Sequence, residues 1–325
     1  MSEAQKVKVG VIGVGYLGRY HAQRWKEVPS ATLVGVADAA PGRALQVANE
    51  LGCQAFASNE ELLRQVQAVS IVVPTVEHYA VAKQALLLDK DILLEKPITM
   101  TLEEADELVQ IAGQRQKIFM VGHLERFNPA VRALAELLTR PAFIEAHRLG
   151  AFQERASNID VVKDLMIHDL DIIFSLVKAR LQRVSASGIA VLSNKIDIAN
   201  ARLEFENGSV ANLTASRVNL GEAVRKIRIF QAENYISLDY QKKEMAIFTL
   251  GPGDDQDPMS RIKIRQVPIG DEDALHAELT AFAEAVATRV PPPVTGEEGR
   301  RALEAALIVN KEIASSLKKF FENAK

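Results

Sequence analysis

The chain has 325 residues with an ordinary globular composition, 48% hydrophobic and 25% charged, and a formal net charge of −3. Its length accommodates two domains with cores of their own, and its charge argues against an electrostatic nucleic-acid binder. The single cysteine, Cys53, excludes an intrachain disulfide and a multi-cysteine metal site. Because residues 1–6 are polar and no stretch reaches the ~18 apolar residues of a membrane span, we expect a cytoplasmic protein without membrane contact.

The first 38 residues carry a nucleotide-binding pattern. A β-branched run at residues 7–12 predicts a buried parallel strand, and a helical pattern extends from residue 16 to about 28. Between them lies a G-x-G-x-x-G turn, made by Gly13, Gly15 and Gly18. A second apolar run at residues 32–37 predicts the next strand, which ends in Asp38. This order of strand, turn, helix, strand and acid predicts a dinucleotide site; the alternative is a turn that needs glycine only for its backbone angles.

Each residue of this pattern has a physical role. Gly13 permits the tight turn, Gly15 lets a pyrophosphate approach the backbone, and Gly18 lets helix and strand pack closely. The helix N-terminus offers free N–H groups to the phosphates. Asp38 is placed to accept hydrogen bonds from a ribose diol, which favours NAD over NADP because a carboxylate repels a 2′-phosphate. Arg43 nearby would soften that preference.

Strands and helices continue to alternate up to residue 121. The apolar strands are nearly continuous, so the pattern predicts a doubly wound parallel sheet, and we assign residues 1–122 to a Rossmann domain. Ser58 with Glu61, and Thr101 with Glu104, have capping-box spacing at two helix starts. The expected helices are residues 41–51, 58 onward, 76–88 and 101–114, and the expected strands are 54–56, 68–73, 91–94 and 117–121.

The rhythm changes beyond Gly122, and residues 123–325 are predicted to form an α+β domain with an open, mostly antiparallel sheet. Short strands with turns between them extend from about residue 183 to 268, and Asn207-Gly208 is the clearest hairpin signal. Residues 251–258 are expected to be a polar loop. Thr295 with Glu298 is another capping-box pair, and packing of the last helix against the first domain is one expected arrangement. The other expected elements are helices at 129–139, 160–177, 271–288 and 297–323 and a strand at 143–150.

Suggestive residues follow two further strands of the predicted parallel sheet. In open α/β sheets, ligands bind beyond the carboxyl ends of the strands. Val73-Pro74-Thr75, with His78 a turn later, follows one strand, and Glu95-Lys96-Pro97 follows the next. Lys96 is poorly placed for a solvated surface role, although a lysine that extends to solvent beside a turn proline is the structural alternative. The sequence leaves open whether Pro97 is cis.

The helix expected at residues 160–177 carries a polar stripe on an otherwise apolar surface. Asp164, His168, Asp171 and Ser175 recur at i, i+4, i+7 and i+11, which is one face of an α-helix. Histidine suits proton transfer near neutral pH, and a carboxylate one turn away can orient it. The alternatives are a histidine satisfied within the core and, less favoured, a metal site that lacks a convincing further ligand. We expect no metal, and local hydrogen bonds rather than chemistry for Asp169 and Asp171.

These motifs together resemble the glucose–fructose oxidoreductase / inositol dehydrogenase (Gfo/Idh/MocA) family over essentially the whole chain. The resemblance rests on G-x-G-x-x-G, then E-K-P, then D-x-x-x-H-x-x-D, with His21, R-F-N-P at residues 126–129 and Asn207-Gly208 as further family-like features. It implies a nucleotide-binding domain followed by an α/β domain whose sheet mediates a homodimer or homotetramer. Many relatives have glycines around the aspartate, whereas this chain has Val161, Val162, Lys163 and Met166.

The resemblance also implies roles for individual residues. Lys96, Asp164 and His168 would form the catalytic set, and the expected cofactor is NAD. Substrate contacts are expected from Lys96, Arg126, Asn128, His168 and Arg217. Apart from the resemblance, Arg217 belongs to a group of cations near the predicted sheet that would pair with a substrate diphosphate, and a charged solvent face or an oligomer rim is the alternative. The expected cofactor-binding residues are Gly13, Gly15, Tyr16, Leu17, Gly18, Asp38, Arg43, Val73, Pro74, Thr75, His78, Glu95, Lys96 and Pro97.

The run D-L-M-I-H-D-L-D most resembles the branch that oxidises nucleotide-linked amino sugars, such as UDP-N-acetylglucosamine at its 3-position. We therefore expect a dehydrogenase that converts a sugar hydroxyl to a ketone, with Lys96 and His168 converging beside the nicotinamide. A dehydrogenase of a free sugar, a cyclitol or a UDP-sugar acid is the alternative enzyme. A non-catalytic NAD(H)-binding sensor is the alternative from another class.

Overall fold

A computed structural model describes residues 6–152, 159–252 and 258–323. The chain forms two compact units, each made of two segments. One unit comprises Met1–Phe127 and Glu272–Leu303, and the other comprises Asn128–Asp271 and Glu304–Lys325. The sequence-based assignment of residues 1–122 and 123–325 to two domains stays a prediction. In the structure, the segment 272–303 makes its contacts with the first unit.

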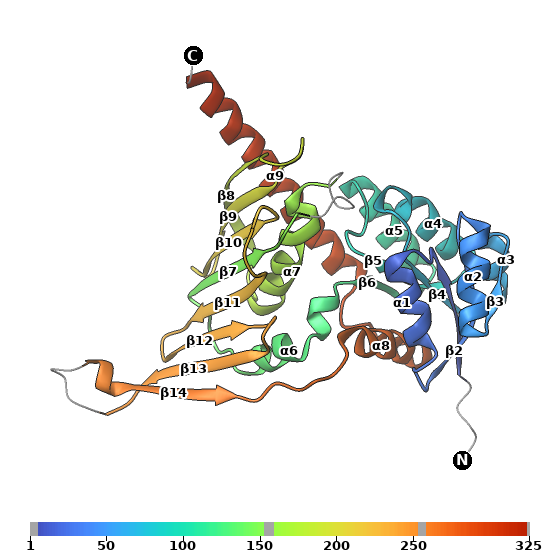
Figure 1. Cartoon of the computed structure of the whole chain (residues 1–325), viewed down its shortest axis with the longest axis horizontal. Helices are drawn as coiled ribbons and strands as arrows, with labels where there is room; N and C mark the ends of the chain where they lie inside the picture. The colour runs from blue at the N-terminus through green and yellow to red at the C-terminus, as the bar shows by residue number, and fades with distance from the viewer. Residues whose placement is uncertain (1–5, 153–158, 253–257, 324–325) are drawn as a thin grey trace. The chain divides into compact units, whose positions relative to one another are not determined.

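The first unit contains a parallel sheet of six strands in the order β3-β2-β1-β4-β5-β6 (Figure 1). The predicted doubly wound fold is confirmed, and this order places the switch point between β1 and β4. Residues of β1, β4 and β5 are almost wholly buried, as strands covered by helices on both faces must be. The strands are β1 (Val7–Ile12), β2 (Ala31–Ala37), β3 (Gln54–Ala55), β4 (Ala68–Ile71), β5 (Asp91–Glu95) and β6 (Phe119–Gly122).

Side-chain caps start several of the helices in this unit, as predicted. The Ser58 hydroxyl accepts the N–H of Glu61, Thr101 and Glu104 form a complete capping box, and Thr295 pairs with Glu298 in the same way. The helices are α1 (Tyr16–Trp25), α2 (Pro41–Leu51), α3 (Asn59–Gln65), α4 (Thr75–Leu87), α5 (Leu102–Gln114) and α8 (Ala274–Thr288), with a 3-10 turn, η1 (Leu124–Phe127).

Helix α8, far along the chain, belongs to the core of the first unit. Trp25 of α1 is fully buried, packs edge-on against Phe282 of α8 at a centroid distance of 6.2 Å, and donates its indole N–H to the hydroxyl of Ser70 on β4 at 2.9 Å. Arg24 also pairs with Asp273, whose carboxylate caps α8, at 2.7 Å. These contacts join α8 to α1 and the sheet, so residues of α8 can reach the buried side of α1.

The second unit contains an eight-stranded sheet in the order β14-β13-β12-β11-β7-β10-β9-β8. Among the described strands of this sheet, only the β7–β10 pairing is parallel, so the predicted mostly antiparallel sheet is confirmed. Asn207-Gly208 forms the turn between β9 and β10, with Gly208 at a φ of 84°. The strands are β7 (Phe143–Leu149), β8 (Leu181–Ile189), β9 (Ile198–Phe205), β10 (Val210–Ser216), β11 (Val224–Phe230), β12 (Asn234–Asp239), β13 (Glu244–Leu250) and β14 (Ile262–Val267).

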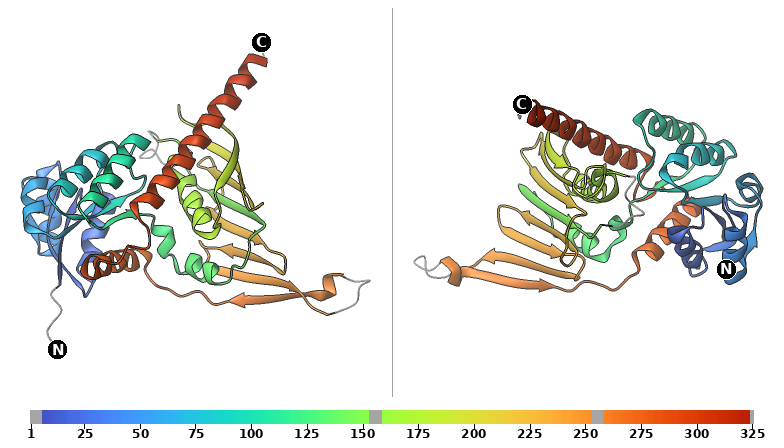
Figure 2. Two further views of the ribbon diagram at one scale, coloured as in Figure 1. Left: turned by 180° about the vertical axis from the view of Figure 1, so that it is seen from behind. Right: turned by 45° about the horizontal axis from the view of Figure 1, so that its top comes forward.

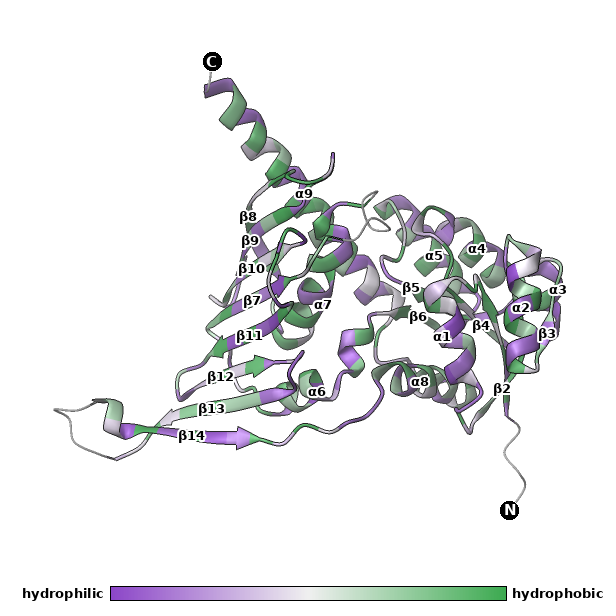
Figure 3. Ribbon diagram, viewed as in Figure 1, coloured by the Kyte–Doolittle hydropathy of each residue, from purple (hydrophilic) through white to green (hydrophobic). Residues whose placement is uncertain are grey.

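The edge strand β14 has both hydrophobic and hydrophilic segments in Figure 3, and the hydrophilic residues Lys263 and Arg265 are exposed on it. Charged residues on an edge strand discourage pairing with a further strand. Part of the polar loop expected at 251–258, residues 253–257, lies outside the described residues. No helix in the described part of the chain is long and apolar enough to cross a membrane.

The predicted single α-helix at residues 160–177 is wrong in its first turn. The structure has a π-helix over Val162–Met166 (η3), in which the N–H of Ile167 reaches the carbonyl of Val162, five residues back. An α-helix, α7 (Ile167–Leu176), follows and lies against one face of the sheet (Figures 1 and 2). The other helical elements of this unit are α6 (Pro129–Glu136), the 3-10 turn η4 (Pro258–Arg261) and the second part of α9 (Gly296–Asn323), which is divided between the units at Leu303.

Candidate active site

The glycine-rich turn has the geometry that a dinucleotide site needs. Gly13 has a φ of 83°, and a Cβ on Gly18 would lie 1.8 Å from the carbonyl oxygen of Gly13. Any larger residue at either position would therefore disrupt the turn. At Gly15, by contrast, a Cβ would meet no atom within 4 Å, so the backbone there is open to an approaching group. Helix α1 begins directly after Gly15 and has no acidic residue in its first turn, which leaves its N-terminus suited to an anion.

A surface cleft of about 660 Å³ adjoins this turn. Gly15 and Tyr16 border it at the helix N-terminus, and Tyr16 and Leu17 are exposed beside it. Arg19 and Arg43 contribute positive charge to its lining. The cleft therefore places two positively charged side chains near the helix N-terminus, an arrangement that suits a phosphate group.

Asp38 lies at the end of β2, beside the glycine-rich turn. Its carboxylate accepts the backbone N–H groups of Val14 and Ala40, both at 2.8 Å. Arg43 approaches the same carboxylate at 3.3 Å; the Asp38 side chain is 6% exposed and that of Arg43 is 53% exposed. A carboxylate has about four acceptor positions, so these contacts leave Asp38 able to accept from a ribose hydroxyl.

His78 joins the ends of β4 and β5. Its Nδ1 lies 2.8 Å from the carbonyl oxygen of Pro97, and its Nε2 lies 3.0 Å from that of Val73. Burial lowers the pKa of the imidazole, and the two carbonyls act in the opposite direction. The Lys96–Pro97 peptide is cis, and Lys96 itself is half-buried. Because β1, β4 and β5 are parallel neighbours, Gly13, Val73 and Lys96 all follow the same edge of the sheet.

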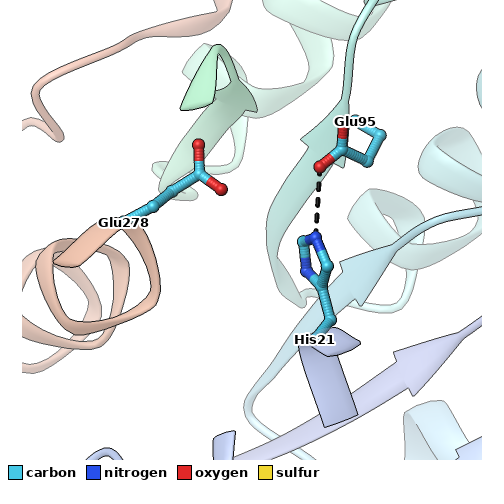
Figure 4. Close-up of side chains that lie close together, drawn as sticks. All are labelled: His21, Glu95 and Glu278. Carbon is cyan, nitrogen blue, oxygen red and sulfur yellow. Dashed lines mark hydrogen bonds and ion pairs between the residues drawn. The ribbon is translucent and has the colours of Figure 1, made fainter. Parts of the chain in front are cut away.

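A buried cluster of His21, Glu95 and Glu278 includes the residue that precedes Lys96 in the chain. Nε2 of His21 on α1 is 3.1 Å from Oε1 of Glu95, while Oε2 of Glu95 accepts the backbone N–H of Lys96 at 3.2 Å. Figure 4 shows Glu278 of α8 directed toward this pair. Burial raises the pKa of Glu95, but its hydrogen bond with His21, together with nearby charged groups that include Lys96, outweighs burial and holds that pKa below its usual value. Burial and the Glu95 charge raise the pKa of Glu278 well above its usual value.

The second unit holds the other predicted catalytic residues. Asp164 lies in the π-helix and His168 in the first turn of α7, and both are half-buried. Asp171, which the predicted stripe placed on the same face, is 1% exposed. The π-helix adds one residue to a helical turn between Asp164 and His168. The α-helical spacing that predicted a single polar face therefore does not apply to these residues.

Asp169, next to His168, is part of a buried ion pair. Arg148 on β7 contacts its carboxylate through Nε and Nη2, each at 3.0 Å, and the hydroxyl of Tyr240 donates to it at 2.6 Å. Arg148 and Asp169 are 4% and 2% exposed. This pair anchors α7 to the sheet and thereby fixes the backbone that carries His168.

The three other predicted substrate residues have structural contacts. Arg126 lies 3.4 Å from Glu298 and 3.3 Å from the carbonyl of Pro293. The amide oxygen of Asn128 caps α6 by accepting the N–H of Ala130 at 3.0 Å.

Arg217 is 2% exposed, and its guanidinium is held by acceptors of the second unit. It contacts Asp197 at 2.7 Å, the carbonyl of Ile159 at 2.7 Å and the hydroxyl of Ser193 at 3.0 Å. The structure thus gives Arg217 a clear role in holding the loop after β8.

Two features of the site region are absent from the sequence-based set. Glu278 was treated only as one position of a helix, and Arg148 as one position of a strand. Glu278 lies between Ala277 and Leu279, and a glutamate among the apolar positions of a helix is a signal that could have identified it. Arg148 had no such signal, because its partner Asp169 is distant in the sequence and only the tertiary structure brings the two together.

Comparison with known proteins agrees with this geometry. Residues 7–123 match the model described as oxidoreductase family, NAD-binding Rossmann fold, and residues 142–236 match the GFO/IDH/MocA C-terminal domain. UDP-N-acetylglucosamine 3-dehydrogenase from Acidithiobacillus ferrooxidans is 41% identical over 96% of this chain and 99% of its own. A scyllo-inositol 2-dehydrogenase (NAD(+)) from Bacillus subtilis is 29% identical over 96% of this chain and 95% of its own.

Solved structures show the same relationship. That of UDP-N-acetylglucosamine 3-dehydrogenase from Acidithiobacillus ferrooxidans matches with a TM-score of 0.89 and 40% identity, covering 95% of this chain and 98% of the other. A scyllo-inositol dehydrogenase from Lactobacillus casei, solved with bound NAD(H) and scyllo-inositol, shares the fold with a TM-score of 0.80, 19% identity and coverage of 96% and 98%. This chain therefore belongs to the Gfo/Idh/MocA family of oxidoreductases, whose N-terminal domain is an NAD-binding Rossmann fold.

Proposed function

We propose that this enzyme is an NAD-dependent dehydrogenase that oxidises the 3-hydroxyl of UDP-N-acetylglucosamine to a ketone. The single observation that carries the proposal is the 41% identity, over nearly the full length of both chains, to an enzyme named for that reaction. The inositol dehydrogenases that match over comparable lengths are 23% to 29% identical. A free cyclitol is therefore the second candidate substrate, and it is the natural comparison in an activity test.

The first unit would hold the cofactor at the carboxyl edge of its sheet. The pyrophosphate would lie over Gly15 and the N-terminus of α1, where a Cβ would meet nothing and the helix has no competing acid. Asp38 would accept hydrogen bonds from the ribose hydroxyls. The remaining contacts would come from residues around the glycine-rich turn and the ends of β4 and β5, namely Tyr16, Leu17, Arg43, Val73, Pro74, Thr75, His78, Glu95, Lys96 and Pro97.

The nicotinamide, when bound, accepts the hydride from the substrate carbon. His168 would take the proton of the same carbon's hydroxyl, so that the alcohol loses one hydride and one proton and a C=O bond forms. Asp164 would orient the imidazole and stabilise its charged form. The ammonium of Lys96 would stabilise the negative charge that develops on the oxygen. Arg126 and Asn128 would add substrate contacts, whereas the buried contacts of Arg217 lead us to leave it out.

NAD is the proposed cofactor in preference to NADP. The Asp38 carboxylate is nearly buried beside the turn and would repel a 2′-phosphate. Arg43 is half-exposed and paired with Asp38, so its charge is partly neutralised before any nucleotide binds. Both features support a preference for NAD, which has a free ribose 2′-hydroxyl, over NADP, which has a 2′-phosphate.

We further propose that the enzyme works in the cytoplasm as a homodimer or homotetramer formed through the eight-stranded sheet. A single cysteine suits a reducing compartment. Light scattering after size exclusion measures the oligomer directly, and a monomer at micromolar concentration would contradict this assignment.

Incubation with NAD and a panel of sugars tests the reaction. We expect absorbance of reduced nicotinamide with UDP-N-acetylglucosamine and none above background with scyllo-inositol, myo-inositol, free N-acetylglucosamine or a UDP-sugar acid. Hydroxylamine in the assay traps the ketone as an oxime, so an unfavourable equilibrium does not hide the product. Turnover of an inositol, without turnover of the nucleotide sugar, would show that the substrate is a cyclitol and not UDP-N-acetylglucosamine. Binding of NAD with no turnover of any sugar would favour a sensor.

A further inference from the structure

The cluster formed by His21, Glu95 and Glu278 places two carboxyl groups and an imidazole together in the core of the first unit. Each residue has one side-chain nitrogen or oxygen atom that lies within 4.8 Å of the corresponding atoms of the other two (Figure 4). His21 and Glu278 have no exposed surface. The three residues come from α1, β5 and α8. Two ionised carboxylates this close in a water-excluded interior would repel each other and lack solvation.

The hydrogen bonds favour Glu95 as the anionic carboxyl group of the cluster. Oε1 of Glu95 faces Nε2 of His21, and Oε2 of Glu95 faces the backbone N–H of Lys96. Both partners can donate, so Glu95 acts as an acceptor at both oxygens, as an ionised carboxylate does. Glu278, in contrast, has no hydrogen-bond partner for either oxygen among the described residues.

The tautomer of His21 then determines whether Glu278 acts as a hydrogen-bond donor or acceptor. With its Nε2–H committed to Glu95, a neutral imidazole presents a lone pair at Nδ1. Nδ1 is buried and has no hydrogen-bond partner among the described residues, and Glu278 lies on the same side of the ring in Figure 4. A protonated carboxylic acid has an O–H to offer to this lone pair, whereas an ionised carboxylate has only further lone pairs.

We propose that Glu278 is a protonated, neutral carboxylic acid that keeps His21 in its Nε2–H form and Glu95 as the single anion of the cluster. Glu278 is thereby a positioning residue for Lys96, because the Glu95 carboxylate holds the Lys96 backbone. This consequence for Lys96 rests on the proposed function, whereas the protonation state does not. The charged or titratable groups that face the cluster are His21 of α1, His78 of α4, Lys96 after β5, and Glu95.

Glutamine is a neutral isostere of a protonated glutamate, so the two glutamates of the cluster form a matched pair for the test. We expect Glu278→Gln to keep kcat and its pH profile, and Glu278→Ala, which removes the donor, to lower kcat at least tenfold. Glu95→Gln removes the anion and is expected to lower kcat at least tenfold. Equal losses in both glutamine variants, or a larger loss in Glu278→Gln, would overturn the assignment.

A stability measurement tests the protonation state without any activity. A group that stays protonated in the fold but ionises at its ordinary pKa of 4.5 when unfolded makes the folded state less favoured as pH rises. The folding equilibrium constant of Glu278→Gln relative to wild type should therefore be near its baseline at pH 4 and rise up to about tenfold per pH unit above pH 4.5, until the folded pKa is reached. A ratio that falls with pH would show an ionised Glu278.

Two spectroscopic and analytical readouts complete the test. Infrared spectra at pH 8 should contain the C=O stretch of a buried protonated carboxylic acid, shifted in D2O and lost in Glu278→Gln. A stoichiometric divalent metal in the purified protein, lost in Glu278→Gln together with stability, would instead make the cluster a cation site. Loss of turnover on every sugar, with the infrared band and the pH-dependent stability ratio intact, would refute the proposed function and leave the protonated Glu278 standing.

Discussion

Oδ2 of Asp38 accepts the backbone N–H of Val14 at 2.8 Å, which ties the end of β2 to the glycine-rich turn. The same carboxylate therefore shapes the turn, and in the proposed cofactor site it would also accept hydrogen bonds from a ribose. An acid at this position would then do more than select between cofactors.

Asp38→Asn should lower kcat/KM for NAD by about tenfold to a hundredfold. That range corresponds to one charged hydrogen bond of about 1.5–3 kcal/mol. The efficiency with NADP should rise relative to NAD, because the repulsion of the 2′-phosphate is removed. Initial rates with each cofactor measure both effects, and Arg43→Ala is the matched control that should weaken any NADP reaction. A wild-type preference for NADP would contradict the assignment of Asp38.

His168→Ala should lower kcat by about a hundredfold to ten-thousandfold, which is the usual contribution of a general base. NAD affinity should remain unchanged, since the proposed cofactor contacts belong to the first unit. Ser175→Ala is a control on the same helix, because the Ser175 hydroxyl donates to the carbonyl of Ile172. Steady-state rates and fluorescence titration with NADH separate the two quantities. Equal losses of turnover and cofactor affinity would argue against a proton-transfer role.

Arg148→Met should destabilise the fold by about 3–5 kcal/mol. It leaves the buried Asp169 carboxylate without its bidentate partner, and an uncompensated buried charge is costly. The exposed pair of Arg228 with Glu145, at 3.7 Å, provides the comparison, and Arg228→Met should cost about 0–1 kcal/mol. Urea unfolding of the three proteins gives both values. Similar small losses in both variants would mean that the Arg148 pair does not anchor α7.

Asp197 should make the free energy of unfolding depend on pH in the acidic range. Burial raises its pKa, but the N–H groups of Val191 and Ser193, the Ser193 hydroxyl and the Arg217 guanidinium outweigh burial and hold the pKa well below its ordinary value. A carboxyl group with a lowered pKa stabilises the fold above its unfolded pKa of 3.8 and loses that contribution as pH falls further.

Asp197→Asn should therefore be less stable than wild type at pH 7, and the difference should shrink as pH falls below 3.8. Thermal unfolding between pH 7 and pH 3 follows this difference. A constant difference across that range would show that packing, rather than the charge of Asp197, accounts for the loss.

The nucleotide-binding unit could be predicted from the sequence nearly element by element. Its glycines, its capping residues such as Thr101 and its β-branched strands each act locally, and local signals determine where such elements begin. The boundaries differ by a few residues: α1 ends at Trp25 rather than near residue 28, and β4 ends at Ile71 rather than residue 73. Helix ends depend on tertiary contacts and are less well encoded.

The π-helix before His168 and the side-chain networks could not be predicted in this way. Residue types do not specify an i→i+5 hydrogen bond, so the run around Asp164 read as an ordinary α-helix. The burial of Arg217 and the approach of Glu278 to Glu95 depend on residues brought together by the fold. The sequence therefore predicted the elements of the first unit better than the partners of individual side chains.

The fate of the hydrogen on the sugar carbon tests the central claim most directly. UDP-N-acetylglucosamine carrying deuterium at C3 is incubated with the enzyme and NAD, and the reduced nicotinamide is analysed by mass spectrometry. The account predicts transfer of the deuterium to the nicotinamide and a 3-keto sugar, trapped as its oxime. Retention of the deuterium in the sugar while NAD is reduced would contradict it.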